Sequence, residues 1–371
     1  MEVIHVVLGK ANPDRMNGVN KVVYQMASHQ AEIGMNVAVW GITSDLTINF
    51  APRNFPTVLF PKSRNPFGIS KALRKALQSY QGQAVFHLHG GWIPFYSSFS
   101  KVLQKKGIPY VITPHGAYNT LAMQRSYWRK YIYFLGFEKR MLQNAHKIHC
   151  LGESEVEGLA RFYPNSKSVQ LPYGFAKPQI PARKEINPEA CVFGYIGRLD
   201  IFTKGLDLLL AAFAQVQSQI PKAQLWIVGD GEAYELQKHI QQNQLEDAVT
   251  WLGAHYGEEK NKLLSQMDIF LHPSRNEGLP TAVLEAAAFG KPCIVTQATN
   301  VGSYITQYQA GICVPNSDIE ALGKAMVTLY QQWENPLVYR VLEHNAQQMV
   351  ERVFNWESTL ASMNQTLYTI S

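Results

Sequence analysis

Short apolar runs alternate with stretches of helical periodicity along the first half of the chain. Apolar runs at 3–8, 37–40, 85–88 and 110–113 predict strands, and apolar residues at helical spacing over 20–33 predict a helix. Strands that alternate with helices are typical of a parallel sheet covered on both faces, because parallel strands need a crossover connection. The pattern therefore predicts an α/β domain in this half.

The same alternation returns in the second half. Its predicted strands lie at 191–196, 225–228, 249–251, 269–272 and 293–296, and its predicted helices at 206–217, 234–242 and 281–289. Between the halves, 175–190 holds three prolines and little apolar periodicity, which indicates a linker. The tail over 338–369 is predicted to be helical, with Trp356 in its middle. A chain of 371 residues suits two domains.

Composition narrows the class of protein. Hydrophobic residues make up 46% and charged residues 17%, which indicates a globular chain and excludes a disordered one. Four scattered cysteines, each in or next to an apolar run and without C-x-x-C spacing, favour reduced thiols over disulfides or zinc. The start of the chain has no basic region of a secretion signal, and no apolar stretch reaches about 18 residues. We therefore expect a cytoplasmic protein, whose net charge of +6 favours an anionic partner or surface.

The most specific segment is 274–292, which follows one predicted strand and opens a helix. Pro280 suits the first turn of that helix, where its missing N–H costs nothing. The backbone N–H groups of Gly278, Leu279 and Thr281 are predicted to lie at the carboxyl end of the strand. Open α/β sheets bind ligands at this edge, and exposed amides there favour anions and sugar hydroxyls.

Two glutamates in this segment offer oxygen acceptors. Glu277 precedes the predicted helix and Glu285 lies within it, and carboxylates suit paired vicinal hydroxyl groups. From the residues alone, the alternative is that Glu277 caps the helix and Glu285 forms a salt bridge.

A second group of residues lies in the loop at 197–205. Arg198 and Lys204 follow a strand that ends in glycine, and two cations at such a place match a diphosphate. The alternative is two solvated loop charges. A tight turn at 228–231, which ends in Gly231, allows the backbone to approach a flat ligand such as a base.

In this order, these stretches resemble the large family of retaining GT-B glycosyltransferases, glycosyl transferases group 1, which includes sucrose-phosphate synthase and bacterial mannosyltransferases. The matching pieces are G-R-x5-K-G at 197–205, V-G-D-G at 228–231, the two glutamates with seven residues between them, G-K-P at 290–292, and G-I-C-V-P at 311–315 with Asp318. The resemblance covers most of residues 190–330.

The resemblance implies an α/β fold of GT-B architecture. It implies two Rossmann-like domains whose parallel sheets face a cleft, and a C-terminal helix that crosses back to the N-terminal domain. We expect an acceptor-binding domain at 1–174, a linker at 175–190, a nucleotide-sugar domain at 191–352 and the crossing helix at 353–371.

The resemblance also assigns roles. It implies that Arg198 and Lys204 bind the donor diphosphate, that Glu277 contacts the donor sugar, and that Glu285 binds the ribose hydroxyls. The remaining residues that we expect at the donor site are Gly231, Gly278, Leu279, Pro280 and Thr281.

The first half departs from the family in places. A doubled glycine is common after the first strand, and here Asn17 precedes Gly18, whose backbone we still expect near the phosphates. Among histidines at strand ends, the resemblance points to His115 as the catalytic one, able to donate to a sugar hydroxyl or a phosphate. We expect His87 to be structural and leave His89 open.

Two further departures leave the sugar open. Tyr173 stands where relatives usually carry Asn, and the glutamate often found just beyond Ser303 is missing. UDP and GDP sugars are both reasonable donors, and the acceptor is expected to be a glycan or a lipid-linked acceptor.

The expected mechanism is retaining transfer in which the departing diphosphate takes the acceptor's proton, with Arg198 and Lys204 stabilising its charge. The chain has no Asp-x-Asp motif, so we expect metal independence, no cofactor beyond the nucleotide sugar, and no nucleic-acid partner. A dinucleotide dehydrogenase is disfavoured because G-x-G-x-x-G is absent. An epimerase or phosphorylase of the same architecture and a non-catalytic nucleotide-sugar-binding protein remain alternatives.

The segment 125–147 carries six Lys or Arg and one acid, Glu138. On a continuous α-helix, one side would hold Arg125, Arg129, Lys139, Arg140 and Lys147. The other side would hold Tyr131, Phe134, Met141 and Leu142, with Trp128 and Leu135 at the border and Lys130 as an exception. The segment predicts either a peripheral contact with an anionic membrane on its inner face or a surface helix packed on the core.

Overall fold

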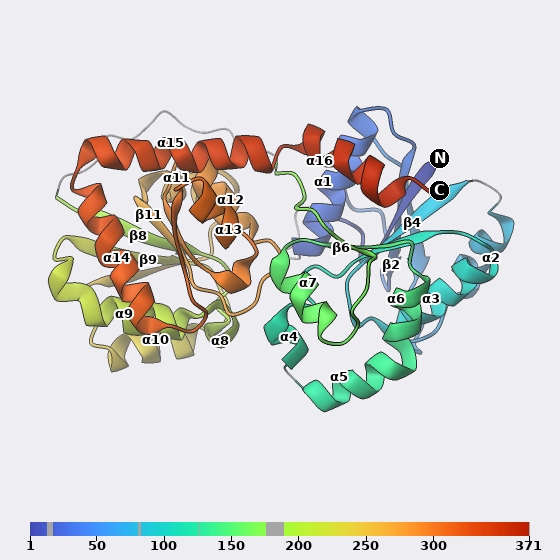
Figure 1. Cartoon of the computed structure of the whole chain (residues 1–371), viewed down its shortest axis with the longest axis horizontal. Helices are drawn as coiled ribbons and strands as arrows, with labels where there is room; N and C mark the ends of the chain where they lie inside the picture. Colours follow the sequence, from blue (N-terminus) through green and yellow to red (C-terminus); the bar gives the residue numbers. More distant parts are fainter. Residues whose placement is uncertain (13–17, 81–82, 125, 176–188, 371) are drawn as a thin grey trace. The chain divides into compact units, whose positions relative to one another are not determined.

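The computed structural model describes residues 1–12, 18–80, 83–124, 126–175 and 189–370. The chain forms two compact units (Figure 1). The first unit comprises Met1–Gly174 and Trp356–Ser371, and the second comprises Phe175–Asn355. Residues 176–188, which are most of the predicted linker, lie outside the described residues. So does Arg125, which was predicted to lie on the basic side of the segment 125–147.

The first unit contains a seven-stranded parallel sheet in the order β3-β2-β1-β4-β5-β6-β7. Its strands are β1 (Glu2–Leu8), β2 (Val37–Thr43), β3 (Thr57–Pro61), β4 (Ala84–His89), β5 (Tyr110–Thr113), β6 (Lys147–Cys150) and β7 (Ser168–Gln170). Four helices precede the basic segment 125–147: α1 (Gly18–Glu32), α2 (Lys71–Ser79), α3 (Pro94–Lys105) and α4 (Thr120–Gln124). Helix α7 (Glu153–Ala160) follows that segment.

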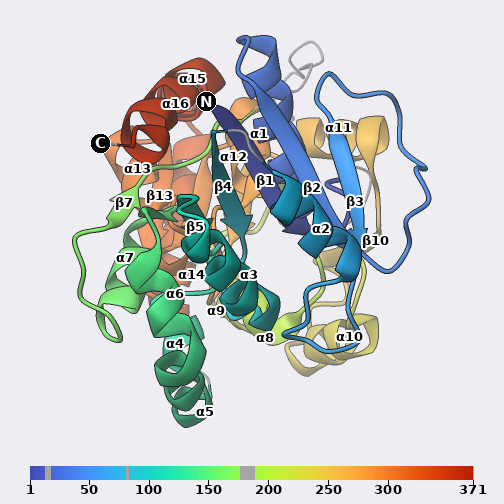
Figure 2. The same ribbon diagram turned by 90° about the vertical axis from the view of Figure 1, so that its right-hand side faces the viewer.

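Alternating side chains of β1 reach opposite faces of this sheet. Ile4 and Val6 belong to the larger core, in which α2 and α3 pack, whereas Val7 packs with Val23 of α1 on the other face. Figure 2 views this unit with α2 and α3 in front of the strands. Both faces are thus covered, as the apolar runs predict.

The second unit contains a six-stranded parallel sheet in the order β10-β9-β8-β11-β12-β13. Its strands are β8 (Cys191–Ile196), β9 (Ala223–Val228), β10 (Val249–Gly253), β11 (Ile269–His272), β12 (Cys293–Thr296) and β13 (Gly311–Val314). Its helices are α8 (Ile201–Lys204), α9 (Leu206–Val216), α10 (Ala233–Gln242), α11 (Gly257–Gln266), α12 (Thr281–Ala288), α13 (Gly302–Gln307), α14 (Ile319–Trp333) and α15 (Pro336–Val353). The strands predicted at 191–196, 269–272 and 293–296 have the observed bounds.

The C-terminal segment returns to the first unit. The helix predicted over 338–369 is interrupted between α15 and α16 (Trp356–Met363), and a π-helix, η4 (Asn364–Tyr368), follows α16. The Trp356 ring packs against His29 of α1 in a tilted arrangement, with ring centroids 5.0 Å apart. A Cβ on Gly174 would collide with the Trp356 ring, so glycine is required at that contact.

The basic segment is not one continuous α-helix. It consists of α5 (Tyr127–Tyr133), a π-helix η1 (Phe134–Glu138) and α6 (Lys139–Asn144). The prediction that Lys147 lies on this helix is wrong, because it begins β6. Phe134, Met141 and Leu142 are buried as expected, but Tyr131, assigned to the apolar side, is exposed, and its ring contacts those of Tyr127 and Phe162.

Lys130, the exception in the helical projection, points toward the protein. Its Nζ lies 5.4 Å from the centroid of the Trp92 ring and donates to the carbonyl of Ala122. The four cysteines form no disulfide, and three of them are buried. Among the described residues, no helix has both the length and the apolar character needed to cross a bilayer.

Candidate active site

Glycines bring two loops together at the carboxyl ends of β8 and β9. Gly229 has φ +153° and Gly231 has φ +142°, and a Cβ on either would collide with the backbone carbonyl of Gly197 or Leu199, respectively. Leu199 and Gly231 pair as an isolated parallel bridge. The predicted V-G-D-G turn therefore packs directly on the loop that carries Arg198.

A third glycine sets the position of Lys204. Gly205 adopts φ +69° at the end of α8, and a Cβ there would collide with the carbonyl of Pro273, just after β11. The carbonyl of Thr203 accepts hydrogen bonds from Arg275 N at 2.8 Å and from Ser274 Oγ at 2.9 Å. The Lys204 loop is thus held against the loop that leads to Glu277.

Arg275 strengthens this attachment. Its guanidinium donates two hydrogen bonds of 2.7 Å to the carboxylate of Asp207 and one of 2.6 Å to the carbonyl of Phe202. The same guanidinium lies 4.4 Å from the centroid of the Phe202 ring. Such a forked contact fixes the loop geometry more tightly than a single hydrogen bond.

Lys204, His272 and Glu277 form one polar cluster. Lys204 Nζ donates to Glu277 Oε1, and His272 Nε2 donates to the same oxygen at 2.8 Å. Burial alone would raise the pKa of Glu277, but the hydrogen bond from His272 and the charge of Lys204 lower it to about 2. Glu277 is therefore ionised at neutral pH.

His272 was missed by the sequence analysis. It ends β11, and its ring is parallel to that of Tyr195, with centroids 5.8 Å apart. Among the residues that the structure describes, its buried Nδ1 has no hydrogen-bond partner. The available signal was a histidine at a strand's carboxyl end, five positions before Glu277.

Arg198 is placed differently from Lys204. Its side chain is 63% exposed and forms an ion pair of 3.1 Å with Asp200, which also caps α8 through Thr203 N. Tyr195 joins the two places, because its hydroxyl donates to the carbonyl of Arg198 at 3.0 Å while its ring lies on His272. Arg198 is therefore an exposed cation, six positions before Lys204 of the partly buried cluster.

The two glutamates have different surroundings. Glu277 is not the N-cap residue of α12, because that position is occupied by Pro280. Glu285 forms an ion pair with Lys260 of α11, Oε2 to Nζ at 2.7 Å, so the salt-bridge alternative describes a contact that is present. Lys260 was not singled out in the sequence, because it lies 25 residues away in an otherwise polar helix.

The turn before α12 is held from the side by Asn300. Its Nδ2 donates to the carbonyls of Glu277 at 3.0 Å and Gly278 at 2.7 Å. Within the described part of the chain, the backbone N–H groups of Gly278 and Thr281 have no acceptor. Leu279, the other amide expected at this edge, lies between them, and Pro280 has no N–H to offer.

In the first unit, Gly18 begins α1 and is exposed. A Cβ there would meet nothing within 4 Å, and the preceding 13–17, including Asn17, lie outside the described residues. Gly9 is the constrained glycine of this loop, with φ +129°, and a Cβ there would collide with Asn20 Oδ1. Asn20 in turn accepts from Ala11 N at 2.8 Å.

His115 follows β5 with a left-handed backbone, φ +54°. This conformation is uncommon for a residue with a Cβ and is often found at functional sites. Its neighbour Gly116 donates its N–H to the buried carboxylate of Glu155, whose pKa burial raises to about 7. His115 Nε2 lies 3.0 Å from Nδ1 of His89, so the residue that the sequence left open joins His115.

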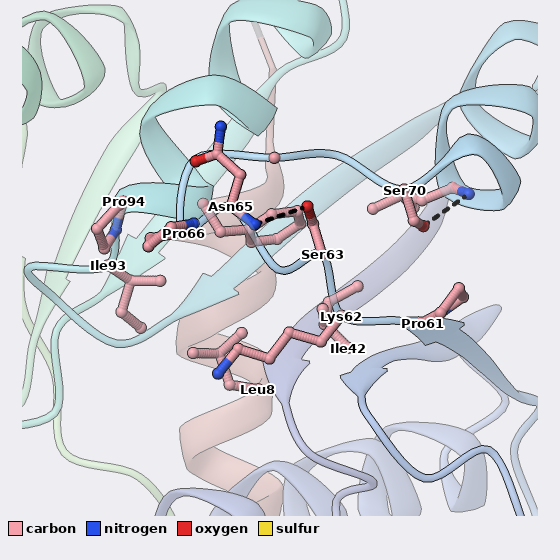
Figure 3. Close-up of a pocket in the computed structure, with 13 residues that line it drawn as sticks. Leu8, Ile42, Pro61, Lys62, Ser63, Asn65, Pro66, Ser70, Ile93 and Pro94 are labelled. Atoms are coloured by element: carbon pink, nitrogen blue, oxygen red, sulfur yellow. Dashed lines mark hydrogen bonds between the residues drawn. The ribbon is translucent and has the colours of Figure 1, made fainter.

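A small pocket lies at the carboxyl ends of β1, β2 and β3. It measures about 110 Å³ and is lined by Leu8, Ile42 and Pro61 from these strands, together with the segment 62–70 and the start of α3. Figure 3 shows the Lys62 side chain crossing the pocket toward Leu8, and Asn65 N donating to Ser63 Oγ at 3.2 Å. This is the edge at which an open α/β sheet binds ligands.

Two family profiles together cover most of the chain. The family described as "Glycosyl transferases group 1" matches residues 176–349, and the one described as "Glycosyltransferase Family 4" matches residues 16–175. The chain belongs to the group 1 glycosyltransferase family. This agrees with the resemblance that its glycine, lysine and glutamate motifs indicate.

Curated relatives and solved structures extend this comparison. The putative glycosyltransferase EpsF of Bacillus subtilis (strain 168) is 25% identical over 248 residues, 63% of this chain and 62% of that protein. The putative colanic acid biosynthesis glycosyltransferase WcaL of Escherichia coli (strain K12) is 31% identical over 174 residues, 44% of this chain and 42% of that protein. The chain thus spans less than two thirds of the length of these relatives.

The structure of Anabaena Alr3699/HepE in complex with UDP and glucose is similar to this chain. The alignment covers 100% of this chain and 100% of that chain, with a TM-score of 0.74 at 16% identity. At this identity the likeness shows the fold alone. The chain has the GT-B architecture, built on two parallel-sheet α/β domains.

Proposed function

We propose that this chain is a retaining glycosyltransferase that moves a sugar from a UDP- or GDP-sugar to a hydroxyl group of a glycan or lipid-linked acceptor in polysaccharide biosynthesis. The observation that carries the proposal is the partly buried cluster of Lys204, His272 and Glu277 at the carboxyl end of β11. The family membership and the polysaccharide-related name of WcaL support it.

The cluster suits a donor that joins a neutral sugar to a negatively charged diphosphate. The ionised carboxylate of Glu277 is an acceptor for sugar hydroxyl groups, which donate hydrogen bonds. Lys204 beside it and the exposed Arg198 supply positive charge for a diphosphate. In the proposed complex, Glu285 on α12 binds the ribose hydroxyls.

The proposed chemistry needs no enzyme nucleophile. Glu277 Oε1 already accepts from Lys204 and His272, which makes it a poor nucleophile. The departing diphosphate instead takes the proton of the acceptor hydroxyl, so that the new glycosidic bond forms on the face that the leaving group vacates. Arg198, Lys204 and the amides of Gly278 and Thr281 stabilise the developing negative charge, without a metal in this proposal.

The test has two stages. The full chain is first screened by thermal unfolding with UDP, GDP and their sugars, where a ligand at 100 times its dissociation constant stabilises by about 2.7 kcal/mol. The stabilising sugar nucleotide is then incubated with and without glycan acceptors, and the anomeric configuration of the product is determined by NMR. Transfer with retention supports the proposal.

Other products would contradict it. An epimerised sugar nucleotide without acceptor would show an epimerase, and phosphate-dependent cleavage would show a phosphorylase. Binding without any turnover would show a binding protein, and an inverted product would overturn the mechanism.

We further propose that the α5–α6 segment contacts an anionic membrane. Trp128 is 73% exposed and Ile132 is 71% exposed on α5, although both are apolar. Exposed Arg129 and Arg140 lie on the same segment. Apolar and basic groups that are both exposed suit a lipid surface better than a helix packed on the core, because lipid can receive both.

A further inference from the structure

A continuous line of hydrogen bonds crosses the interior of the first unit, from the carbonyl of Leu171 to the ring of His115. All its members lie in this unit, on β1, α1, β4, β5, β6 and η4 and in the loops beside them. In the order in which each is hydrogen-bonded to the next, they are Leu171, His149, Thr113, His87, Tyr368, Gln30, His5, His89 and His115. Since each neutral imidazole has one N–H and one lone pair, one fixed end determines the direction of every bond.

The fixed end is the carbonyl of Leu171, which can only accept. His149 Nε2, at 2.7 Å, must therefore carry the proton. Burial lowers the pKa of His149 to about 4, so the ring is neutral at pH 7 and Nδ1 has the lone pair. The hydroxyl of Thr113, at 2.8 Å, consequently donates to Nδ1.

The direction continues through β4. Thr113 has used its only hydrogen, so its oxygen accepts from His87 Nε2 at 2.5 Å. Burial lowers the pKa of His87 well below its usual value, which leaves a lone pair on Nδ1. The hydroxyl of Tyr368, at 2.8 Å, donates to that lone pair.

Gln30 passes the direction on to β1. The Tyr368 oxygen can now only accept, and it does so from Gln30 Nε2 at 3.4 Å. The carboxamide oxygen of Gln30 therefore faces His5 Nε2, at 2.6 Å, and accepts a hydrogen bond from its N–H group. Burial lowers the pKa of His5 to about 4, so His5 Nδ1 carries a lone pair.

The line ends at His115. His89 Nε2 donates to His5 Nδ1 at 2.9 Å, and burial keeps His89 neutral by lowering its pKa, so its Nδ1 is an acceptor. His115 Nε2 donates to it at 3.0 Å. Burial lowers the pKa of His115 to about 3, so its Nδ1 has a lone pair, which has no partner among the described residues.

We propose that this line of hydrogen bonds holds His115 in the tautomer with the proton on Nε2, so that Nδ1 accepts a hydrogen bond from a hydroxyl group of the substrate. The last step rests on the proposed function, since it takes the substrate to be a sugar. The other side chains of the line are positioning residues.

The tautomer of His115 determines whether its Nδ1 can bind a phosphate oxygen or a sugar hydroxyl group. A phosphate oxygen has no hydrogen to give at neutral pH and would face the lone pair of Nδ1, whereas a sugar hydroxyl can donate to it. The low pKa of His115 also makes the ring a weak base, so it orients the hydroxyl without removing its proton. The left-handed backbone and the contact of Gly116 with Glu155 hold the ring in place.

A metal ion is the competing use of these histidines, because ring nitrogens of His5, His87 and His89 lie within 4.8 Å of one another. A ligand nitrogen must present a lone pair to the metal. The contact between His5 Nδ1 and His89 Nε2 at 2.9 Å instead needs a proton between the two nitrogens. The hydrogen-bonded line satisfies both atoms without a metal.

The test is ¹⁵N NMR of histidine-labelled full-length protein without nucleotide at pH 7, with His115 assigned by loss of its signals in His115→Gln. We expect the chemical shift of an unprotonated nitrogen for Nδ1 of His115 and of a protonated one for Nε2. The reverse pattern, or metal that co-purifies with the protein and shifts these signals, would overturn the assignment.

A variant pair tests the origin of the tautomer. Gln30→Met keeps the length of the side chain but removes both polar atoms, and should give His115 a mixture of tautomers. Gln104→Met, whose residue pairs with Asn144 outside the line, is the matched control and should leave His115 unchanged. A pure Nε2–H tautomer in folded Gln30→Met would show that the line does not set it.

Ligand additions test the hydroxyl contact. UDP-glucose offers donor-sugar hydroxyls, methyl glucoside offers an acceptor-like hydroxyl, and bare UDP offers neither. A shift of the Nδ1 signal with one of the sugar probes but not with UDP identifies the source, whereas a shift with UDP alone or with no probe overturns the contact. If the tautomer is found but no sugar is ever transferred, the proposed function fails and the tautomer stands.

Discussion

Lys204 and Glu277, which are 73 positions apart in the chain, form a partly buried ion pair in the second unit, Nζ to Oε1. The pair exists because Gly205 allows α8 to approach the backbone after β11. It places the cation expected on the phosphate and the carboxylate expected on the sugar in direct contact. A substitution of either residue therefore also changes the surroundings of the other.

Lys204→Met should weaken UDP binding by about 1.5–3 kcal/mol, the range for hydrogen bonds to charged groups, while uridine binding changes far less. It should also lower thermal stability, because the partly buried Glu277 loses its cation. Arg198→Ala should weaken UDP binding without the loss of stability, since that side chain is 63% exposed. Calorimetric titration and thermal unfolding measure both effects, with exposed Lys324→Met as the control.

Equal losses of affinity for uridine and UDP would remove the phosphate assignment. Normal stability of Lys204→Met would show that the ion pair contributes nothing to the fold.

Glu277→Gln should reduce transfer by roughly 10- to 100-fold, because a charged acceptor for the donor sugar is lost. UDP affinity should stay the same or rise, since Lys204 is released from the carboxylate. The measurement is kcat for transfer beside the dissociation constant of UDP. Loss of UDP binding in this variant would contradict the division between sugar and phosphate contacts.

Glu285→Gln should weaken nucleoside binding, and a 2′-deoxy donor should then lose little further affinity, because the hydroxyl partner is already gone. Lys260→Met separates this role from that of the ion pair, since it removes the cation and leaves the carboxylate. If Glu285→Gln and the 2′-deoxy donor lower affinity additively, Glu285 does not bind the ribose.

The apolar runs sufficed to predict the central strands, because a strand buried on both faces shows a continuous run such as 191–196. The glycine motifs pointed to Lys204 and Glu277 because the backbone constraints at Gly205 and Gly231 leave a direct trace in the sequence. Strand order leaves no such trace, which is why the contact of His5 with His87 across β1 and β4 was not predicted.

Other features of the site depend on single residues without a pattern. His272 and Lys260 reach their glutamates through the fold, not through a motif. The π-turn at 134–138 was missed because a helical projection assumes about 100° per residue throughout. Hydrogen-bond direction in the histidine line follows from distances between atoms and has no counterpart in residue spacing.

The buried histidines predict acid sensitivity of the first unit. His5 and His149 have pKa values lowered to about 4 by burial, against about 6.5 in the unfolded chain. Their stabilisation is complete above pH 6.5 and is lost as the pH falls toward 4, at about 3 kcal/mol for each. Amide hydrogen exchange of β1 and β4, followed by mass spectrometry from pH 7 to pH 5, measures this loss directly.

Two carboxyl groups act in the opposite direction. Burial raises the pKa of Glu138 and Glu155 to about 7, so their stabilisation is present below pH 4.5 and is lost as the pH rises through 7. Glu138→Gln removes one of these contributions and should make stability rise more steeply with pH between 5 and 7. An unchanged slope would show that Glu138 is not protonated in the folded protein.

The exposed face of α5 leads to the last prediction, binding to anionic vesicles. Basic residues near such a surface contribute about 1 kcal/mol each and are screened beyond about 8 Å at physiological salt. Arg129→Gln with Arg140→Gln should therefore weaken binding at low salt, and wild-type binding should fall sharply by about 0.5 M salt.

Trp128→Ala with Ile132→Ala should weaken the binding that remains at high salt, because apolar burial is not screened. Leu337→Ala is the matched control, since Leu337 is 77% exposed on α15 of the other unit. Sedimentation with vesicles of anionic and of zwitterionic lipid measures all of these, and a wild-type protein that stays in solution at low salt would leave a soluble acceptor as the better proposal.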